Sequence, residues 1–163
     1  MRRRLQILLG MIEENQWCYL DKEDIRSIHA ALSSWAEQHE EPVPSFVHAN
    51  HNDIDALVST PRQQFSGQDA YPTIAEKAAI IFYTVNKKQI FLNGNKRMST
   101  LCLLVFLGLN GKALDVPPDE LTKKALWLAN TSSHEFPAIK SELVQWIAAH
   151  VKDAPEPTRA NHD

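Results

Sequence analysis

The sequence has little cysteine, no long hydrophobic run and a nearly balanced charge. Cys18 and Cys102 stand far apart, and Cys102 lies inside an apolar segment, so we expect two reduced thiols in a cytoplasmic protein and no disulfide framework. No segment approaches the about 18 consecutive apolar residues that a membrane-spanning helix needs. A formal net charge of -3 provides no broad positive surface, which argues against direct contact with nucleic acid or with an anionic membrane.

The chain is long enough for one compact core and too short for two. It has 163 residues, of which 44% are hydrophobic. Three arginines and a few apolar residues open the sequence, but acidic residues follow at once, so residues 1–16 are expected to form an amphipathic helix and not a signal peptide. We predict a folded domain over residues 17–151 and a disordered tail over residues 152–163.

Apolar residues recur at helical spacing through most of the folded part. Asp21 and Thr73 precede two amphipathic segments as N-caps, each with an acidic residue three positions later. The segment 63–73 is the only predicted β-hairpin, with Gly67 and Asp69 as turn residues. The prediction is all-α with one small hairpin, and further helices are expected at about 52–60, 96–110, 119–130 and 135–151.

Residues 96–110 are apolar nearly all round, which predicts a helix buried at the centre of a bundle, ended by Gly111. His29, His134 and His150 are interpreted as surface or cap residues. The tryptophans lie on apolar helix faces and are expected in the core: Trp17, Trp35, Trp127 and Trp146.

A polar, cationic turn precedes this apolar helix. The residues "NGN" can fold into a nest of backbone N–H groups at the helix N-terminus, and Lys96 and Arg97 add positive charge there. The combination predicts a local anion site, most naturally for phosphate. The alternative is an ordinary inter-helix turn with two solvated cations.

The stretch "QIFLNGNKRMSTLCLLVFLGLNG", residues 89–111, resembles the signature loop and central helix of the Fic/Doc family. The family pattern is His-x-Phe-x-(Asp/Glu/Asn)-(Gly/Ala)-Asn-(Gly/Lys)-Arg, and the Lys-Arg ending is similar to the death-on-curing (Doc) branch. "CYLDKEDIRSIHAAL" and "STPRQQFSGQDAYPTIAEKAAIIFYTVNKKQ" resemble the opening helix and the segment that leads into the loop. The resemblance spans about residues 17–151 and implies a compact Fic/Doc-type helical bundle around a buried central helix, with a β-hairpin flap.

The family transfers part of a nucleotide, usually AMP from ATP, to a hydroxyl of a protein target, and the Doc branch transfers phosphate. The resemblance therefore implies ATP or another nucleotide with Mg²⁺ as cofactors and a cytoplasmic protein as target. It implies Phe91 as the loop's core anchor, with phosphate contacts from Gly94, Asn95, Lys96 and Arg97. It also implies a target-docking flap made of Phe65, Ser66, Gly67, Gln68, Asp69, Ala70 and Tyr71.

Two departures from the family pattern weaken the implied chemistry. Gln89 stands where the family has its catalytic His, and its amide cannot act as a general base. Asn93 stands where an acidic Mg²⁺ ligand is usual and offers only an uncharged oxygen. His48 and His51 could replace the base only if the fold brings them to the loop.

Regulation in this family often uses a glutamate that pairs with the signature-loop arginine, supplied by the chain itself or by an antitoxin. Glu14 in "GMIEEN" is the closest match within the chain, and a separate antitoxin is the alternative. Two functions stay open: a Doc-like toxin transferase, or a degenerate Fic domain that binds a nucleotide or a partner without transfer. A DNA-binding regulator is disfavoured by the negative net charge.

Overall fold

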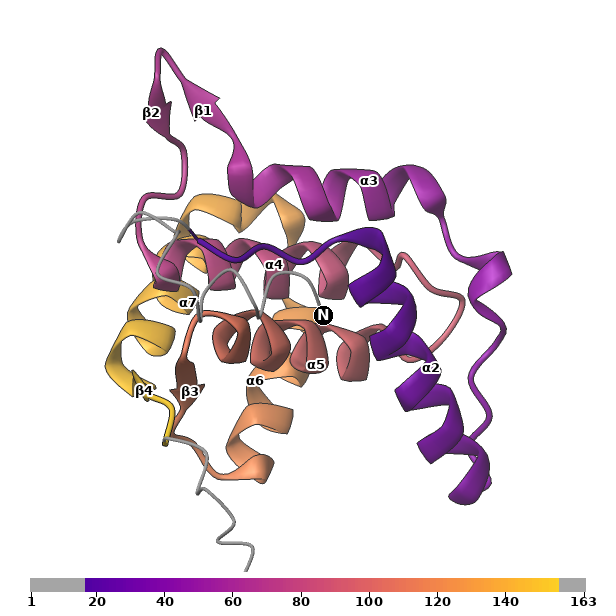
Figure 1. The fold of residues 1–163 in the computed structure, drawn as a ribbon. Helices are drawn as coiled ribbons and strands as arrows, with labels where there is room; N and C mark the ends of the chain where they lie inside the picture. Colours follow the sequence, from indigo (N-terminus) through magenta and orange to yellow (C-terminus); the bar gives the residue numbers. More distant parts are fainter. Residues whose placement is uncertain (1–16, 156–163) are drawn as a thin grey trace, which may run out of the picture.

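The computed structural model describes residues 17–155 as an all-α domain with two small antiparallel sheets (Figure 1), as the sequence predicts for the fold class. The predicted helix over residues 1–16 lies outside the described residues. Three short 3-10 helices, Phe46–His48, Thr60–Arg62 and Ser133–Glu135, connect the longer elements. The α-helices of the described part are α2 (Lys22–Gln38), α3 (His51–Ser59), α4 (Ile74–Lys88), α5 (Asn95–Leu109), α6 (Pro118–Asn130) and α7 (Phe136–His150).

The helix boundaries follow the capping residues of the sequence. The side chains of Asp21 and Thr73 each accept a hydrogen bond from the backbone N–H three residues later. In turn, the carboxylate at that later position accepts a hydrogen bond from the backbone N–H of Asp21 or Thr73. Asn50 caps α3 through its side-chain oxygen, which accepts from the N–H of Asp53, while its own N–H donates to the carbonyl of Ile90. Gly111, with a φ of 69°, follows the end of α5 in the left-handed conformation expected of a helix terminator.

The antiparallel helices α4 and α5 form the centre of the domain, with α7 and α6 against them and α2 at one end (Figure 1). α4 is the more enclosed of the two, since ten of its residues are buried against six in α5. The prediction of complete burial for the 96–110 helix was therefore wrong for one face: Leu104 is 37% exposed and Leu109 is 42% exposed. The sequence could not indicate this, because an apolar helix does not show which of its positions the neighbouring helices leave uncovered.

Each of the two sheets pairs two short strands. β1 (Gln64–Phe65) and β2 (Gln68–Asp69) form the predicted hairpin, whose turn residues are Ser66 and Gly67, with φ of 52° and 79°. Asp69, expected in the turn, lies instead in β2, and its carboxylate accepts a hydrogen bond from the buried Lys77, 3.1 Å away.

The second sheet was not predicted. β3 (Lys112–Leu114) pairs with β4 (Val151–Asp153), and the N–H of Ala154 donates to the carbonyl of Gly111 at 2.9 Å. The predicted disordered tail therefore starts too early, because residues 152 and 153 belong to a strand. Strands of three residues whose partners are far apart in sequence leave no periodic signal. The rest of the tail, from residue 156, lies outside the described residues.

The expectation that the tryptophans lie in the core is correct in part. Trp127 and Trp146 are half-buried and pack against the core, whereas Trp35 is 44% exposed. No helix between residues 17 and 155 is long and apolar enough to span a membrane.

Candidate functional site

The loop that joins α4 to α5 is fixed onto the core through its first half. Gln89 ends α4 in the left-handed conformation, with φ 49° and ψ 51°, and its side chain is exposed. Ile90 and Phe91 are buried, and the carbonyl of Ile90 accepts a 2.8 Å hydrogen bond from the N–H of Asn50. Phe91 is thus the core anchor that the resemblance implies, and Gln89 projects from a held backbone.

Phe91 packs on a buried histidine. The rings of His29 and Phe91 stack with centroids 5.2 Å apart, and Phe46 meets His29 edge-on at 5.4 Å. His29 is only 3% exposed, so its interpretation as a surface or cap residue was wrong. Burial lowers the pKa of His29, and a hydrogen bond to the backbone of Pro44 opposes that shift in part. A neutral His29 therefore supports the loop from α2.

The second half of the loop is held by its own side chains. The Asn95 amide braces Phe91: its Oδ1 accepts from the Phe91 N–H at 2.9 Å, and its Nδ2 donates to the Phe91 carbonyl at 2.6 Å. Asn93 Oδ1 accepts from the N–H of Gly94 at 2.7 Å. Gly94 has a φ of 81°, which a residue without Cβ adopts readily. The side chain of Asn95 therefore shapes the loop, and only its backbone N–H is left for an anion.

The N-terminus of α5 carries no side-chain cap. Its first backbone bond within the helix runs from the N–H of Met98 to the carbonyl of Gly94, at 2.8 Å. The N–H groups of Asn95, Lys96 and Arg97 come before that bond and have no acceptor within the helix. These groups, at the positive end of the helix dipole, can receive an anion.

Two cavities flank the loop and share Asn93, Gly94, Asn95 and Lys96 in their walls. The loop cavity, of about 200 Å³, also contains Gln89. The outer cavity, of about 400 Å³, also contains Glu41, Pro42 and Arg97. The structure therefore brings all the predicted loop residues except Arg97 together with Gln89 in one cavity.

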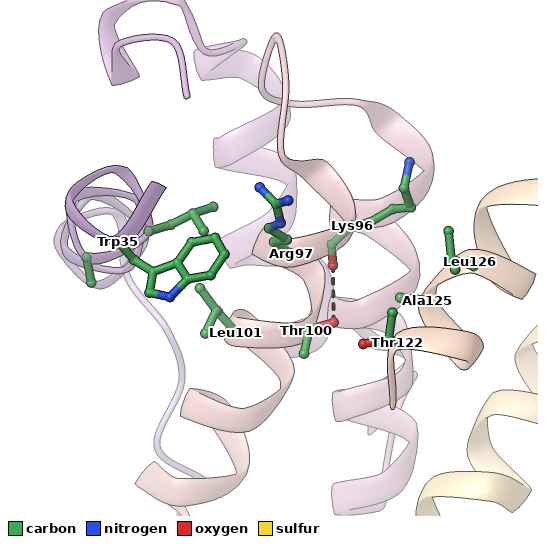
Figure 2. Close-up of a pocket in the computed structure, with 10 residues that line it drawn as sticks. Trp35, Lys96, Arg97, Thr100, Leu101, Thr122, Ala125 and Leu126 are labelled. Atoms are coloured by element: carbon green, nitrogen blue, oxygen red, sulfur yellow. Dashed lines mark hydrogen bonds between the residues drawn. The ribbon is translucent and has the colours of Figure 1, made fainter. Parts of the chain in front are cut away.

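Arg97 does not line the cavity that contains Gln89, and its side chain lies on the side of α2 that carries Trp35 (Figure 2). Its guanidinium forms an ion pair with Glu41 and lies over the Trp35 ring, with Cζ 5.3 Å from the ring centroid. An anion that approaches Arg97 must therefore compete with a carboxylate of the same chain.

The described residues do not form a carboxylate cage for Mg²⁺. They contain no group of three or more His, Cys, Asp or Glu side chains placed to hold a metal ion. Asn93 offers one amide oxygen, which already accepts a hydrogen bond, and Glu41 is paired with Arg97. A hard cation prefers several charged oxygens, so the metal position assigned to Asn93 is weak without phosphate oxygens.

The predicted flap lies at the other end of α4 from the loop (Figure 1). The flap segment precedes α4 and the loop follows α4. The length of α4, about 22 Å at 1.5 Å per residue, therefore separates the flap from the loop. Phe65 is 70% exposed at the hairpin, whereas Tyr71 faces α7, where Lys140 Nζ lies 4.8 Å from its ring centroid. The structure does not place the flap residues at the loop cavity.

The remaining candidate residues do not line the loop cavity. His48 and His51 precede or begin α3 and are absent from its walls, although Asn50 between them contacts the loop. Glu14 lies outside the described residues.

Sequence reasoning missed four residues of the site. Glu41 and Trp35 hold Arg97 from positions far along the chain, and no motif marks them. Asn86 and Lys87 line the loop cavity from the last turn of α4, directly before the quoted motif. The ammonium of Lys87 is not free for phosphate, because it donates to the carbonyl of Leu128 at 3.0 Å and to neighbouring carbonyls at the end of α6.

Comparison with known proteins agrees with this architecture. Residues 19–107 match the Fic/DOC family. The chain is 31% identical over 99 residues to Toxin Doc of Mycolicibacterium smegmatis, an alignment that covers 59% of this chain and 75% of that protein. No solved structure matches the chain. The match to the family covers more than half of the sequence and includes the whole loop, and the chain therefore belongs to the Fic/DOC family.

Proposed function

We propose that the loop 93–97 binds the phosphates of a nucleotide, with ATP as the first candidate, in a Doc-like Fic protein related to toxin-type transfer to a protein hydroxyl. The observation that carries the proposal is the uncapped N-terminus of α5, which lies beside Lys96 and Gln89 in one cavity. The backbone N–H groups and the positive end of the α5 dipole lie beside the cavity that Lys96 lines. This combination of N–H donors and positive charge suits phosphate oxygens. The relative named Toxin Doc supports the toxin-type context.

The transfer would form a phosphorus–oxygen ester on the target hydroxyl. Attack on the α-phosphorus of ATP transfers AMP and releases pyrophosphate, and attack on the γ-phosphorus transfers phosphate and releases ADP. In both reactions the hydroxyl proton must leave, and Gln89 can orient the hydroxyl through its amide oxygen without taking that proton. The absence of a general base costs about 10²–10⁴ in rate. Loop N–H groups and Lys96 would still stabilise charge on the transferring group.

Mg²⁺ fits this proposal only as an ion that arrives with the nucleotide phosphates, since the loop supplies no carboxylate for it. An antitoxin and a protein target are the proposed partners, and the cytoplasm is the proposed location, in keeping with a toxin relative.

A second candidate function is a degenerate Fic domain that binds a nucleotide or a partner and transfers nothing. Gln89 and Asn93 favour it, because the positions that supply a base and a metal ligand in the family carry neither. The ion pair between Arg97 and Glu41 also favours it, because it reduces the positive charge available to a transition state.

Binding and transfer are tested separately. Calorimetry with ATP should show affinity reduced about tenfold or more in Lys96→Ala, which loses a charge-assisted contact to phosphate. Arg97→Ala should reduce the affinity less, because Arg97 lines only the outer of the two cavities at the loop and is paired with Glu41. Arg26→Ala is the matched control. Arg26 is an arginine of α2 whose guanidinium lies over the ring of Phe46, and it does not line either cavity at the loop. Unchanged affinity in folded Lys96→Ala and Arg97→Ala would remove the loop as the binding site. Incubation with ATP labelled at the α or the γ phosphate, with a cell lysate, then distinguishes AMP transfer, phosphate transfer and no transfer.

A further inference from the structure

A hollow along α5 leaves apolar side chains uncovered. An apolar cavity of about 580 Å³ lies between α2, α5 and α6, with Trp35 and Leu126 at its two sides and Leu101 from α5 between them (Figure 2). Leu104 and Gly108 are exposed and continue the line of Leu101 toward the C-terminal end of α5, since residues three and four apart share a helix face. The cavity and this continuation are here called the side groove. A contiguous apolar hollow of this kind is typical of a surface that another segment covers.

We propose that residues 1–16 of the same chain pack as an amphipathic helix in the side groove, parallel to α5. This inference does not depend on the function proposed above. It commits the side groove to one occupant, the part of the chain that precedes the described residues.

The position of Cys18 is the first argument. Its N–H donates to Asn110 Oδ1 at 2.9 Å, and its carbonyl accepts from Asn110 Nδ2 at 2.8 Å, so the chain before Cys18 starts at the C-terminal end of α5. A helix over residues 1–16 would be about 24 Å long, and α5, with 15 residues, is about 22 Å long. Residues 1–16 therefore have the length to follow α5 from this end to the other.

The pattern of residues 1–16 is the second argument. In a helix, Leu5, Leu8, Leu9 and Ile12 share one face, and Ile7 lies on the opposite side. An isolated helix of this length is only marginally stable in water, so its apolar face needs a surface to pack against. The side groove offers an apolar surface that no other described element covers.

Charge complementarity is the third argument. A helix that ends beside the C-terminal end of α5 places three arginines, residues 2–4, at the N-terminal end of α5. The end of α2 lies there, because Glu41 pairs with Arg97, and Glu37 and Glu40 add two exposed carboxylates close to Glu41 in the chain. The connection of the chain and the attraction between these charges therefore favour the same direction.

The arrangement separates residues 1–16 from the regulation that the resemblance implies. Glu14 would lie near Asn110, which is about 20 Å along α5 from Arg97, at 1.5 Å per residue. Arg97 therefore keeps Glu41 as its partner. The loop cavity shares only Lys96 with the cavity of the side groove, so a helix in the groove leaves the loop cavity open.

Thiol labelling of the full chain tests the proposal. Leu104→Cys is combined with Cys18→Ser, because the other natural thiol, Cys102, is buried and burial raises its pKa to about 12. Covered by residues 1–16, the thiol at position 104 should react with iodoacetamide about tenfold or more slowly than the thiol of Ala148→Cys, at an exposed position of α7.

Ile12→Glu, on the apolar face of the segment, should restore fast labelling at position 104, because a charge cannot be buried against leucines. Ile7→Glu makes the same change on the opposite face and should leave labelling slow. Leu126→Cys, on the α6 side of the groove, gives the same measurement if Leu104→Cys fails to fold.

Fast labelling in the chain with its natural residues 1–16 would overturn the proposal. Slow labelling that Ile12→Glu does not change would overturn it as well. Slow labelling that becomes fast on dilution would replace residues 1–16 with a second copy of the chain as the occupant of the side groove.

Discussion

The guanidinium of Arg97 is ion-paired with the carboxylate of Glu41, which lies 56 positions earlier in the chain. Arg97 lies in the first turn of α5, and Glu41 belongs to the segment that follows α2. The pair links the end of one helix to the signature loop and determines which direction the arginine faces.

Glu41→Gln should strengthen ATP binding, because it frees Arg97 from its carboxylate. Both side chains are about half exposed, and pairs of this kind contribute up to about 1 kcal/mol, so we expect a gain of about two- to fivefold at low salt. The gain should shrink at high ionic strength. Calorimetry at two salt concentrations measures it, with Glu40→Gln as the control for loss of a nearby exposed carboxylate. Weaker binding in Glu41→Gln would mean that Glu41 itself contacts the ligand.

The double variant Gln89→His with Asn93→Asp should acquire or increase transferase activity. The new histidine adds a titratable base beside the loop, and the new carboxylate adds a charged metal ligand while it can still accept the Gly94 N–H. Histidine tolerates the left-handed conformation observed at residue 89 better than most residues do.

Transfer of label from ATP by this variant should rise through about pH 6.5, as the histidine loses its proton. Gln38→His, at an exposed position of α2, controls for a histidine placed elsewhere. If the natural chain transfers label as fast as the variant, Gln89 takes part in a working mechanism and the degenerate alternative is eliminated.

Asn95→Ala should lower both stability and nucleotide affinity, because Asn95 closes the loop through two hydrogen bonds to Phe91. Leaving these backbone groups without partners costs about 1–3 kcal/mol of unfolding free energy. Chemical denaturation measures the loss, with Asn130→Ala at the exposed end of α6 as control. A loss of affinity without a loss of stability would instead assign the Asn95 side chain to direct contact with phosphate.

Stability should fall as the pH drops below about 6.5, the ordinary pKa of histidine, because His29 is buried and its pKa in the folded chain is lowered. In the window between the lowered pKa and the ordinary value, the unfolded chain binds a proton that the folded chain does not, so protonation favours unfolding. Denaturant titrations from pH 7.5 to 5 measure the slope, which should decrease in His29→Gln. His134→Gln at an exposed position is the matched control, and an unchanged slope in His29→Gln would show that another group causes it.

Phe65→Ala tests the hairpin as a docking site for the target. Phe65 is 70% exposed, so the change should alter stability by less than about 0.5 kcal/mol while it reduces modification or binding of the target. Val47→Ala is the control, because Val47 is similarly exposed at 69% on a different element. If Phe65→Ala retains full target binding, the hairpin is not the docking site for the target. That result would agree with the position of the hairpin at the opposite end of α4 from the loop.

Much of the secondary structure and the anchoring of the loop could be predicted from the sequence. Asp21, Thr73 and Gly111 determine helix ends through local hydrogen bonds and backbone preference, which act between residues close in the chain. The anchoring of Phe91 and the presence of cations at the start of α5 likewise follow from the order of residues in one short segment. The resemblance to the Fic/Doc family rests on this segment together with the opening helix and the segment that leads into the loop.

The tertiary structure decided which side chains meet across the site. The Glu41 partner of Arg97, the burial of His29 under Phe91 and the exposure of Trp35 depend on how α2 lies against α5, and helical periodicity does not encode that angle. The pairing of the short strands β3 and β4 was also set by the tertiary structure. Contacts between segments that are distant in the sequence leave no periodic pattern in either segment. Local sequence determined the loop and the cations that follow it. Helix packing determined that Arg97 pairs with Glu41 and does not line the cavity that contains Gln89, because that geometry exists only when α2 and α5 come together.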